Sequence, residues 1–426
     1  MAFGVTDTIV AGRFSEASLA ALSVGAAIYM SVFVGLMGGL QALMPIWAEL
    51  QGAKQYARIG ASFRQSLYVC AIAMLMGMGI LLYPQALLDW AEVPQALQPE
   101  IRKYLTILAL ALPPALLFRL YSSLNQSLGR PSFVTWLQIG ALFVKIPLSI
   151  WLTFGFLGVP AMGVAGCAWA TLLVTGVMLG IAVWLMRSQS FYRPYQIWRA
   201  MEKPHGPTLA AFARLGVPAG LAILVEVTSF TLMALFIARL GTLAAAGHQI
   251  AANLATVLYM VPLAIGIATS ARVSYWLGAD DKRHAAHALS LGFYLALGCG
   301  LLLCAALLLA RAPLAALYAS SPQVIEQSVV LLGWVAVFIV FDSLQAVGLF
   351  VLRCFRITLA PLVIYGVLLW GMGLMGGYRL AYTGIFGFAP LQMPAAFWMS
   401  NTLALACTAL LFWLMLLLLM RREARP

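Results

Sequence analysis

The chain has 426 residues, of which 63% are hydrophobic and only 9% are charged, whereas roughly 25% of residues are charged in an ordinary soluble domain. This composition excludes a soluble protein, because no soluble core could absorb so much apolar surface, and it indicates a protein that lies in a lipid bilayer. A formal net charge of +12 would suggest nucleic acid as the partner of a soluble protein, but in a membrane protein its meaning lies in the position of each charge, and we expect no nucleic-acid partner.

Eleven apolar runs are each long enough to cross a hydrocarbon core of about 30 Å as a helix. The predicted spans are Leu19–Leu43, Leu67–Leu88, Tyr104–Leu124, Phe133–Phe156, Val164–Leu185, Leu215–Leu240, Ala244–Ala271, Ala288–Leu309, Val329–Leu352, Leu359–Leu380 and Ala396–Met420. Before them, Met1–Ala11 is an apolar segment too short to cross. It lacks the basic region of a signal peptide, so we expect it to be the end of a first helix that begins upstream in the natural chain.

Lys and Arg residues gather in alternate connections between these spans and in the C-terminal tail. Examples are Lys54, Arg64, Arg130, Lys282 and Arg353. By the positive-inside rule, these connections and the C-terminus are expected to face the cytoplasm. The chain is therefore predicted to be a multi-pass protein of the cell inner (plasma) membrane.

One long polar segment divides the chain into residues 1–186, an N-terminal lobe, and residues 209–426, a C-terminal lobe, with a cytoplasmic linker at residues 187–208 between them. The lobes are expected to hold helices 1–6, the first incomplete, and helices 7–12.

The two lobes carry a weak internal repeat. A shift of 226 residues places Gly52 on Gly278, Tyr68 on Tyr294 and Arg130 on Arg356. This offset spans an even number of helices, so both copies have the same orientation across the membrane, as in transporters with a cavity between parallel repeats. The predicted fold is all-α integral membrane, with two six-helix lobes related by a parallel pseudo-two-fold repeat and twelve transmembrane helices, the first truncated in this chain.

Three of the thirteen acidic residues, Asp7, Glu226 and Asp342, lie at depth inside apolar runs. A carboxylate at the bilayer centre costs about 2.5–3.5 kcal/mol, so it needs a role or a partner. Carboxylates that face one cavity can bind a cation such as Na⁺ through oxygen, or hold a proton because burial and mutual repulsion disfavour two charges. A structural ion pair or hydrogen bond is the alternative. Tyr259 would add a cation–π face to the site, or simply pack.

Other kinds of chemistry find little support. The six cysteines lie in apolar stretches with no CxxC spacing, so we interpret them as packing residues. There is no HExxH, no GxSxG and no cluster of histidines, so the chain is not expected to be an enzyme, and no tightly bound cofactor is expected. Prolines inside the spans are expected to interrupt helices and to offer points of bending. These are Pro113, Pro114, Pro147, Pro218 and Pro262.

Several stretches in order along the chain resemble one known family. They are FGVTDTIVAGRFS from Phe3, SLGRPS from Ser127, PAMGVAGCAWAT from Pro160, GVPAGLAILVEVTSF from Gly216, LGTLAAAGHQIAANLATVLYMVPLAIGIATSARVSYWLGA from Leu240, FDSLQAVGLFVLR from Phe341 and WGMGLMGGYRL from Trp370. Together they resemble the multidrug and toxic compound extrusion (MATE) transporters, and among them the NorM-like bacterial branch.

The resemblance implies a secondary active antiporter that exports lipophilic, often cationic, drugs by alternating access in exchange for Na⁺ or H⁺. It places Asp7 on the family's first-helix aspartate, and Glu226 and Asp342 on the acidic residues of the second-lobe cation site, with Tyr259 beside them. Glu226 and Asp342 would be the ligands of Na⁺ if sodium is the coupling ion. Polar residues expected to contact the substrate are Gln249, Asn253, Gln345 and Lys145.

The chain also departs from the family pattern. Ser122 and Gln126 stand where an Arg and a Glu are usual, and Ile357 replaces an aspartate. Lys145 stands in the fifth helix where Asn is common, and a lysine at membrane depth needs a partner or loses its proton. It is expected to pair with Asp7 or to favour anionic or zwitterionic substrates. The alternative is that it snorkels to the nearer interface.

Two other functions stay open at this point. A flippase for a lipid-linked saccharide, from the same superfamily, would need a basic cavity, for which Lys145 and Arg119 are the candidates. A channel is disfavoured by the two-lobed repeat. The chain is expected to act as a monomer in the lipid bilayer, because one chain holds both lobes.

Overall fold

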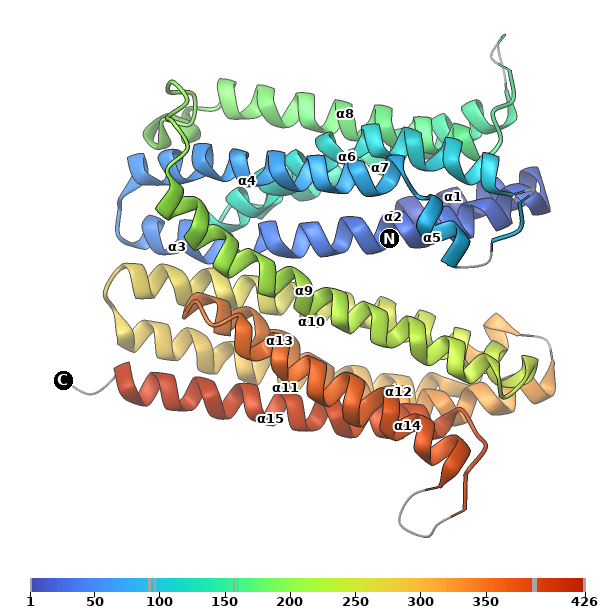
Figure 1. Cartoon of the computed structure of the whole chain (residues 1–426). Helices are drawn as coiled ribbons and strands as arrows, with labels where there is room; N and C mark the ends of the chain where they lie inside the picture. Colours follow the sequence, from blue (N-terminus) through green and yellow to red (C-terminus); the bar gives the residue numbers. More distant parts are fainter. Residues whose placement is uncertain are drawn as a thin grey trace. The chain divides into compact units, whose positions relative to one another are not determined.

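The computed structural model describes residues 2–90, 93–95, 97–155, 158, 160–319, 321–384 and 389–423. In this part of the chain the secondary structure is helical, without strands (Figure 1). The chain folds into two compact units, Met1–Gln51 with Gln55–Gly220, and Gly52–Lys54 with Leu221–Pro426. Among the described residues, eleven helices are long and apolar enough to cross a membrane. Each overlaps one of the eleven predicted spans, although the bounds differ by up to 11 residues, as at Tyr56–Leu82 where Leu67–Leu88 was predicted, and the all-helical membrane fold is confirmed.

The first unit begins with a short helix that does not reach across a bilayer, since its 13 residues rise about 20 Å. Its helices are α1 (Ala2–Phe14), α2 (Glu16–Gln41), α3 (Met44–Gly52), α4 (Tyr56–Leu82), α5 (Gln85–Trp90), α6 (Gln98–Ser127), α7 (Pro131–Phe154), α8 (Val164–Ser188) and the 3₁₀ helix η1 (Ser190–Tyr195). Helix α9 (Gly206–Ala238) starts in this unit and ends in the second.

The second unit continues from α9 with the remaining helices. They are α10 (Thr242–Gly278), α11 (Lys282–Tyr318), α12 (Pro322–Cys354), α13 (Leu359–Tyr365), the π-helix η2 (Gly366–Met375), α14 (Gly376–Tyr378), the π-helix η3 (Arg379–Thr383) and α15 (Ala395–Glu423). The segments from α13 to η3 follow one another without a break and form a single span, Leu359–Thr383.

Each unit is built around one central helix. In the most apolar 18-residue stretch of each span, 67% of the α6 residues and 78% of the α12 residues are buried, compared with 17–33% in the other spans. Helix α6 packs against α2, α4 and α8, and α12 packs against α10, α11 and α15. If α1 counts as the first helix of the first half and α9 as the first helix of the second half, α6 and α12 are each the fourth helix of their half. Each of them contacts the second, third and sixth helices of the same half. The same helices therefore pack in the same way in both halves, as the predicted repeat requires.

Small residues allow these helices to pack closely, as is typical where no hydrophobic difference separates protein from lipid. A Cβ atom added to Gly166 of α8 would come within 2.6 Å of the carbonyl group of Leu152 in α7. Gly377 lies in the same way against Phe397 of α15. A larger side chain at either position would force the helices apart.

The prolines inside the spans do not break them. Helix α6 runs through Pro113 and Pro114, α7 through Pro147, α9 through Pro218 and α10 through Pro262, so the expectation that proline interrupts these helices is wrong. The irregular helix is instead the span Leu359–Thr383, which contains π-helical turns. The hydroxyl of Ser400 in α15 donates to the carbonyl of Met372 at 2.6 Å, a side-chain partner of the kind that irregular membrane helices need.

The polar segment between α8 and α9 is held against α4 in the first unit. The Arg64 guanidinium, 5% exposed, forms an ion pair with Glu202 at 2.5 Å and donates to the carbonyl of Gln196 at 2.6 Å. The amide of Gln65 donates to the carbonyl of Lys203 at 2.9 Å. The charge pattern of the sequence groups Arg64 with the loop cations, but this residue lies within α4 and anchors the connection.

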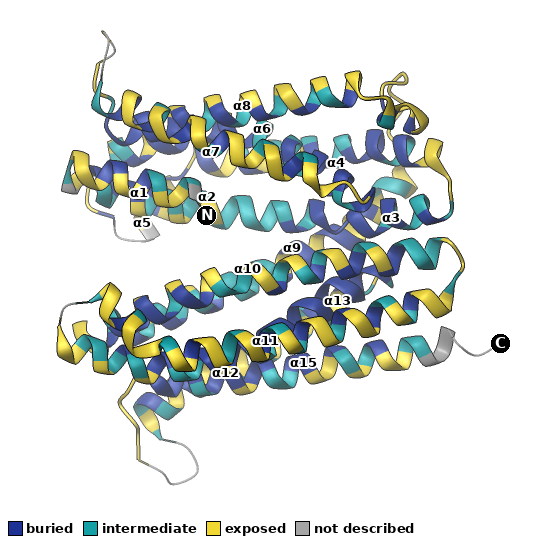
Figure 2. Ribbon diagram, turned by 180° about the vertical axis from the view of Figure 1, so that it is seen from behind, coloured by how far each residue is buried: buried dark blue, intermediate teal, exposed yellow. Residues whose placement is uncertain are grey.

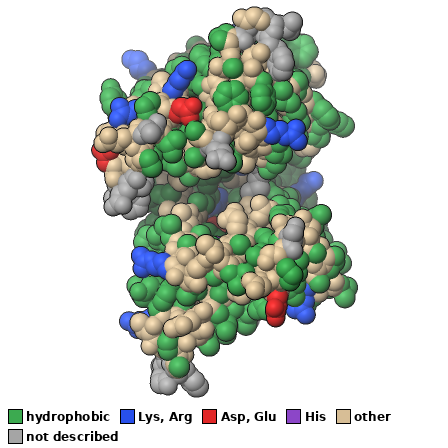
Figure 3. Space-filling model, turned by 90° about the vertical axis from the view of Figure 1, so that its right-hand side faces the viewer, with side chains coloured by type: hydrophobic (Ala, Val, Ile, Leu, Met, Phe, Trp, Pro, Cys, Tyr) green, Lys and Arg blue, Asp and Glu red, His purple; other side chains and the backbone are tan. Residues whose placement is uncertain are grey.

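Large apolar side chains cover the outward faces of the spans. On α11, for example, Leu302 is 68% exposed and Leu309 is 86% exposed, and exposed residues recur along this helix in Figure 2. Figure 3 looks at one set of helix ends, where hydrophobic side chains are also common and charged ones are few. The apolar outward faces of the spans are stable against acyl chains, and they agree with a chain that crosses the bilayer many times.

Candidate functional site

The two acidic residues of the second unit lie beside a shared glutamine. Glu226 comes from α9, and Asp342 and Gln345 come from the central helix α12. The side-chain amide of Gln345 donates to Asp342 Oδ1 at 2.9 Å and approaches Glu226 Oε1 at 3.5 Å. Asp342 is 4% exposed and Gln345 is fully buried. The structure therefore brings together two predicted cation ligands and one residue that was expected to contact the substrate.

The orientation of this glutamine is determined by Tyr365 of α13. Its hydroxyl donates to Gln345 Oε1, and both side chains are fully buried. Because ionised carboxylates only accept hydrogen bonds, the amide nitrogen must face Asp342 and Glu226, and the amide oxygen must face the tyrosine. Tyr365 was not among the predicted residues, since a tyrosine in an apolar run carries no signal that separates it from ordinary packing.

A buried arginine lies on the same helix as Asp342, about three turns further along the chain. Arg353 lies in the last turn of α12 with 1% of its surface exposed. Within the described part of the chain, none of its three guanidinium nitrogens has a hydrogen-bond partner, and its guanidinium carbon lies 4.5 Å from the centre of the Phe350 ring. Its charge interacts with that of Glu226. The charge pattern of the sequence groups Arg353 with the cytoplasmic loop cations, so its burial is a second feature that the prediction missed.

Helix α10 carries the remaining predicted polar residues of this unit. Tyr259 is half-buried, and its hydroxyl group lies within electrostatic range of the Glu226 and Asp342 carboxyl groups. Gln249 and Asn253 are exposed, and they share one helix face because they are four residues apart. The hydroxyl of Tyr318 donates to Asn253 Oδ1 at 3.2 Å. Among the described residues, neither the Gln249 nor the Asn253 side chain is hydrogen-bonded to Glu226 or Asp342.

The first unit holds a different arrangement around Asp7 of α1. Lys145 Nζ of α7 lies 2.8 Å from Asp7 Oδ1, and the hydroxyl of Ser149 donates to the same oxygen at 3.3 Å. Lys145 Nζ also donates to the carbonyl of Cys167 at 2.9 Å and to Thr171 Oγ1 at 2.6 Å, both in α8. Of the alternatives for Lys145, the pairing with Asp7 is confirmed. Snorkelling is wrong, because the lysine is 0% exposed.

Two of the positions that depart from the family pattern, Ser122 and Gln126, are structural neighbours. The amide of Gln126 donates to Ser122 Oγ at 3.3 Å, one turn away on α6. Ser122 is 1% exposed. A short polar contact within the helix therefore occupies the two positions where the resemblance leads us to expect an Arg and a Glu.

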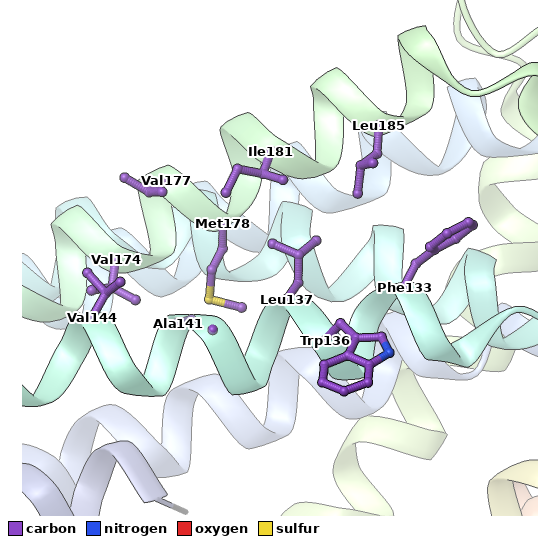
Figure 4. A pocket seen from close by; sticks show the side chains of 11 residues that line it. Phe133, Trp136, Leu137, Ala141, Val144, Val174, Val177, Met178, Ile181 and Leu185 are labelled. Carbon is purple, nitrogen blue, oxygen red and sulfur yellow. The ribbon is translucent and has the colours of Figure 1, made fainter.

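A groove of about 440 Å³ lies between α7 and α8 of the first unit, and its eleven lining residues carry no charge (Figure 4). Trp136 borders it with 73% of its surface exposed, and Val177 is 57% exposed. Because its walls offer neither a charge nor a carboxylate, the groove cannot bind a cation through oxygen. It has the composition of a surface that contacts acyl chains.

Comparison with known proteins gives one consistent family. The MatE family model matches residues 1–151 and 218–378. The probable multidrug resistance protein NorM of Aromatoleum aromaticum is 34% identical over 422 residues, covering 99% of this chain and 91% of the relative. The multidrug resistance protein MdtK of Pectobacterium atrosepticum is 31% identical and covers 99% of this chain and 92% of the relative.

Solved structures agree on the fold. The Vibrio cholerae MATE transporter VcmN in the bent form has a TM-score of 0.87 at 20% identity, and the eukaryotic MATE transporter AtDTX14 has a TM-score of 0.86 at 20% identity. Each comparison covers 99% of this chain and 93% of the solved chain. The chain is therefore a membrane transporter of the MatE family, in the bacterial NorM-like branch, and not an enzyme.

Proposed function

We propose that this chain is a secondary active multidrug exporter, in which a cation that moves inward drives lipophilic, often cationic, compounds outward by alternating access. The observation that supports this most directly is the group formed by Glu226, which is half-buried, with the buried Asp342 and Gln345 in the second unit. Two carboxylates at membrane depth that share one amide are costly unless a cation can join them. The bacterial relatives, which are named multidrug resistance proteins, agree with multidrug efflux.

The charges of the site favour one monovalent cation in each cycle. With both carboxylates ionised, Glu226 and Asp342 contribute two negative charges and the buried Arg353 contributes one positive charge. The group therefore has a net charge of −1, which one Na⁺ or one H⁺ neutralises. Carboxylate oxygens are suitable ligands for Na⁺ and suitable acceptors for a proton, so the donor set is compatible with either ion.

The exposed face of α10 supports an aqueous substrate path. Gln249, Asn253 and Thr256 are all exposed, and their spacing of four and three residues places them along one face. A polar stripe on a membrane-spanning helix is unfavourable against lipid, so we propose that it lines water. Cationic drugs would meet amide oxygens there, while the apolar residues between them contact the body of the drug.

The alternative of a lipid-linked saccharide flippase loses support from Lys145. Such a protein needs basic side chains that are free to bind a diphosphate, whereas the Lys145 ammonium is buried against Asp7. Only Arg119 remains of the two basic candidates, and it is half-buried. Multidrug export is thus the better proposal. We further propose that the chain acts as a monomer in the inner membrane with its C-terminus in the cytoplasm, as its loop charges indicate.

The proposal is tested by reconstitution of the full chain in vesicles that contain a fluorescent cationic dye. Efflux is measured under an imposed Na⁺ gradient and, separately, under an imposed proton gradient, for the wild type, Glu226→Gln and Asp342→Asn. We expect the wild type to export dye under one gradient and both variants to lose that gradient-driven efflux. Glu326→Gln, at an acidic residue near the start of α12, is the matched control and should behave as the wild type. Dye export that persists in both site variants would contradict the assigned role.

A further inference from the structure

We propose that the ε-ammonium of Lys145 is a built-in cation of the first unit, which occupies the position on Asp7 that a coupling ion would take and leaves ion coupling to the second unit alone. This inference rests on the proposed function and adds a division of labour between the two units. It makes Lys145 a residue that determines which unit responds to the ion gradient.

The first argument is that the ammonium is fully coordinated. An ammonium group has three N–H donors, and Lys145 Nζ has three oxygen acceptors within 2.9 Å, namely Asp7 Oδ1, the carbonyl of Cys167 and Thr171 Oγ1. A carboxylate, a carbonyl and a hydroxyl are also the oxygen types that bind an alkali-metal ion. The helices α1, α7 and α8 thus form an oxygen site whose occupant is covalently part of the chain.

The second argument is charge. Asp7 and Lys145 together are neutral, so the pair has no net charge that would attract a further cation. Protonation of Asp7 would leave a buried ammonium without its counter-ion, which is strongly unfavourable. In the second unit, by contrast, Glu226 and Asp342 outnumber Arg353. An external cation therefore neutralises the net negative charge of the second-unit group, whereas in the first unit it would give the neutral pair a net positive charge.

The third argument is that Lys145 has no capacity left for another partner. The side chain is 0% exposed, its donors are all used, and the ring of Phe3 lies 5.9 Å from Nζ. A substrate could reach the amine only after the ion pair opened. A tethered ammonium also has a high effective concentration beside Asp7, so free Na⁺ competes poorly with it.

The first test replaces the tethered cation by a free one. In Lys145→Ala, the thermal midpoint of the purified full chain should rise with methylammonium chloride, because methylammonium restores the missing ion. Tetramethylammonium chloride, which has no N–H donor, should give no such rise. The wild type, Asp7→Asn/Lys145→Ala and the control Lys103→Ala, at an exposed lysine of α6, should not respond to methylammonium.

The inference would be overturned if Lys145→Ala folds but its thermal midpoint does not rise with methylammonium. If the variant does not fold in ordinary buffer, expression and purification with methylammonium should recover it, and failure of this recovery counts against the inference as well. The Asp7→Asn/Lys145→Ala variant, which removes both charges, should fold in either buffer. A pair that served only to fill space would show none of this dependence on amine.

The second test measures how many cations move with each dye molecule, from the ion gradient that just balances a known dye gradient. We expect one cation for the wild type and Lys103→Ala, two for Lys145→Ala, because Asp7 then takes an ion, and one again for Asp7→Asn/Lys145→Ala. Two cations in the wild type, or one in Lys145→Ala, would overturn the inference. Wild type without any gradient-driven efflux would refute the proposed function instead, while the amine test still decides the role of Lys145.

Discussion

Tyr365→Phe removes one hydroxyl from the second-unit site and should make the site bind its coupling ion more tightly. In the wild type the hydroxyl binds Gln345 Oε1, so the amide nitrogen faces the carboxylates and stabilises their ion-free, charged state. Without the tyrosine hydroxyl, the amide is free to turn over. Its oxygen would then face Asp342, where it repels the bare carboxylate but can bind Na⁺ or accept a hydrogen bond from a protonated carboxyl.

The size of the effect follows from the hydrogen bond between Gln345 and Asp342, which is 2.9 Å long. A hydrogen bond to a charged group contributes about 1.5–3 kcal/mol, and an interaction of this size that the turned amide adds to the ion-bound state alone corresponds to about 10- to 100-fold tighter ion binding. The contact to Glu226 at 3.5 Å is at the limit of hydrogen bonding and is not counted. Tighter binding also slows ion release, so the maximal efflux rate should fall.

The assay is dye efflux from vesicles as a function of the concentration of the coupling ion. Tyr365→Phe should reach half-maximal efflux at about 10- to 100-fold lower ion concentration than the wild type. Tyr382→Phe is the matched control, because it removes a hydroxyl that donates to the carbonyl of Phe236 at 2.7 Å in the same unit. An unchanged or higher half-maximal concentration in Tyr365→Phe would refute the assigned orientation of Gln345.

Two further predictions concern the connection held against α4. Gly60→Ala should lower the free energy of unfolding by about 1–3 kcal/mol, because its new Cβ would meet the carbonyl oxygen of Tyr195. Thermal unfolding measures this change, with Gly79→Ala as the control because a Cβ there meets nothing within 4 Å. An effect of Gly60→Ala no larger than that of the control would contradict the prediction. In Arg64→Met, trypsin should cleave the connection about fivefold faster than in the wild type. The lost ion pair contributes about 1 kcal/mol, because its partner Glu202 is 46% exposed. An unchanged cleavage rate would show that the ion pair does not hold the connection.

The spans and the carboxylates were predictable because the bilayer imposes strong constraints on sequence. A run of about 20 apolar residues is typical of a membrane-spanning helix and of few other structures. An acidic residue inside such a run is costly and therefore conspicuous. This is why Asp7, Glu226, Asp342 and Lys145 could be singled out from the sequence, and why the pairing of Lys145 with Asp7 was among the alternatives.

The remaining features depend on packing that no local pattern encodes. Arg353 stands next to genuine loop cations, so only the fold reveals that its side chain turns into the unit. Tyr365 is one aromatic residue in an apolar run. The face of α10 that carries Gln249 and Asn253 could be identified by spacing, but whether it is buried or exposed depends on the neighbouring helices. Their part in substrate binding stays a prediction.

The π-helical turns at Gly366–Met375 have a consequence for comparing sequences within the family. A π turn accommodates one more residue than an α turn over nearly the same rise, so it is the helical counterpart of an insertion. Deleting one residue here could restore α-helical hydrogen bonding while both ends of the span keep their positions. An alignment gap at this place would therefore record a change of helical winding, and it would not mean that the relative lacks a membrane span.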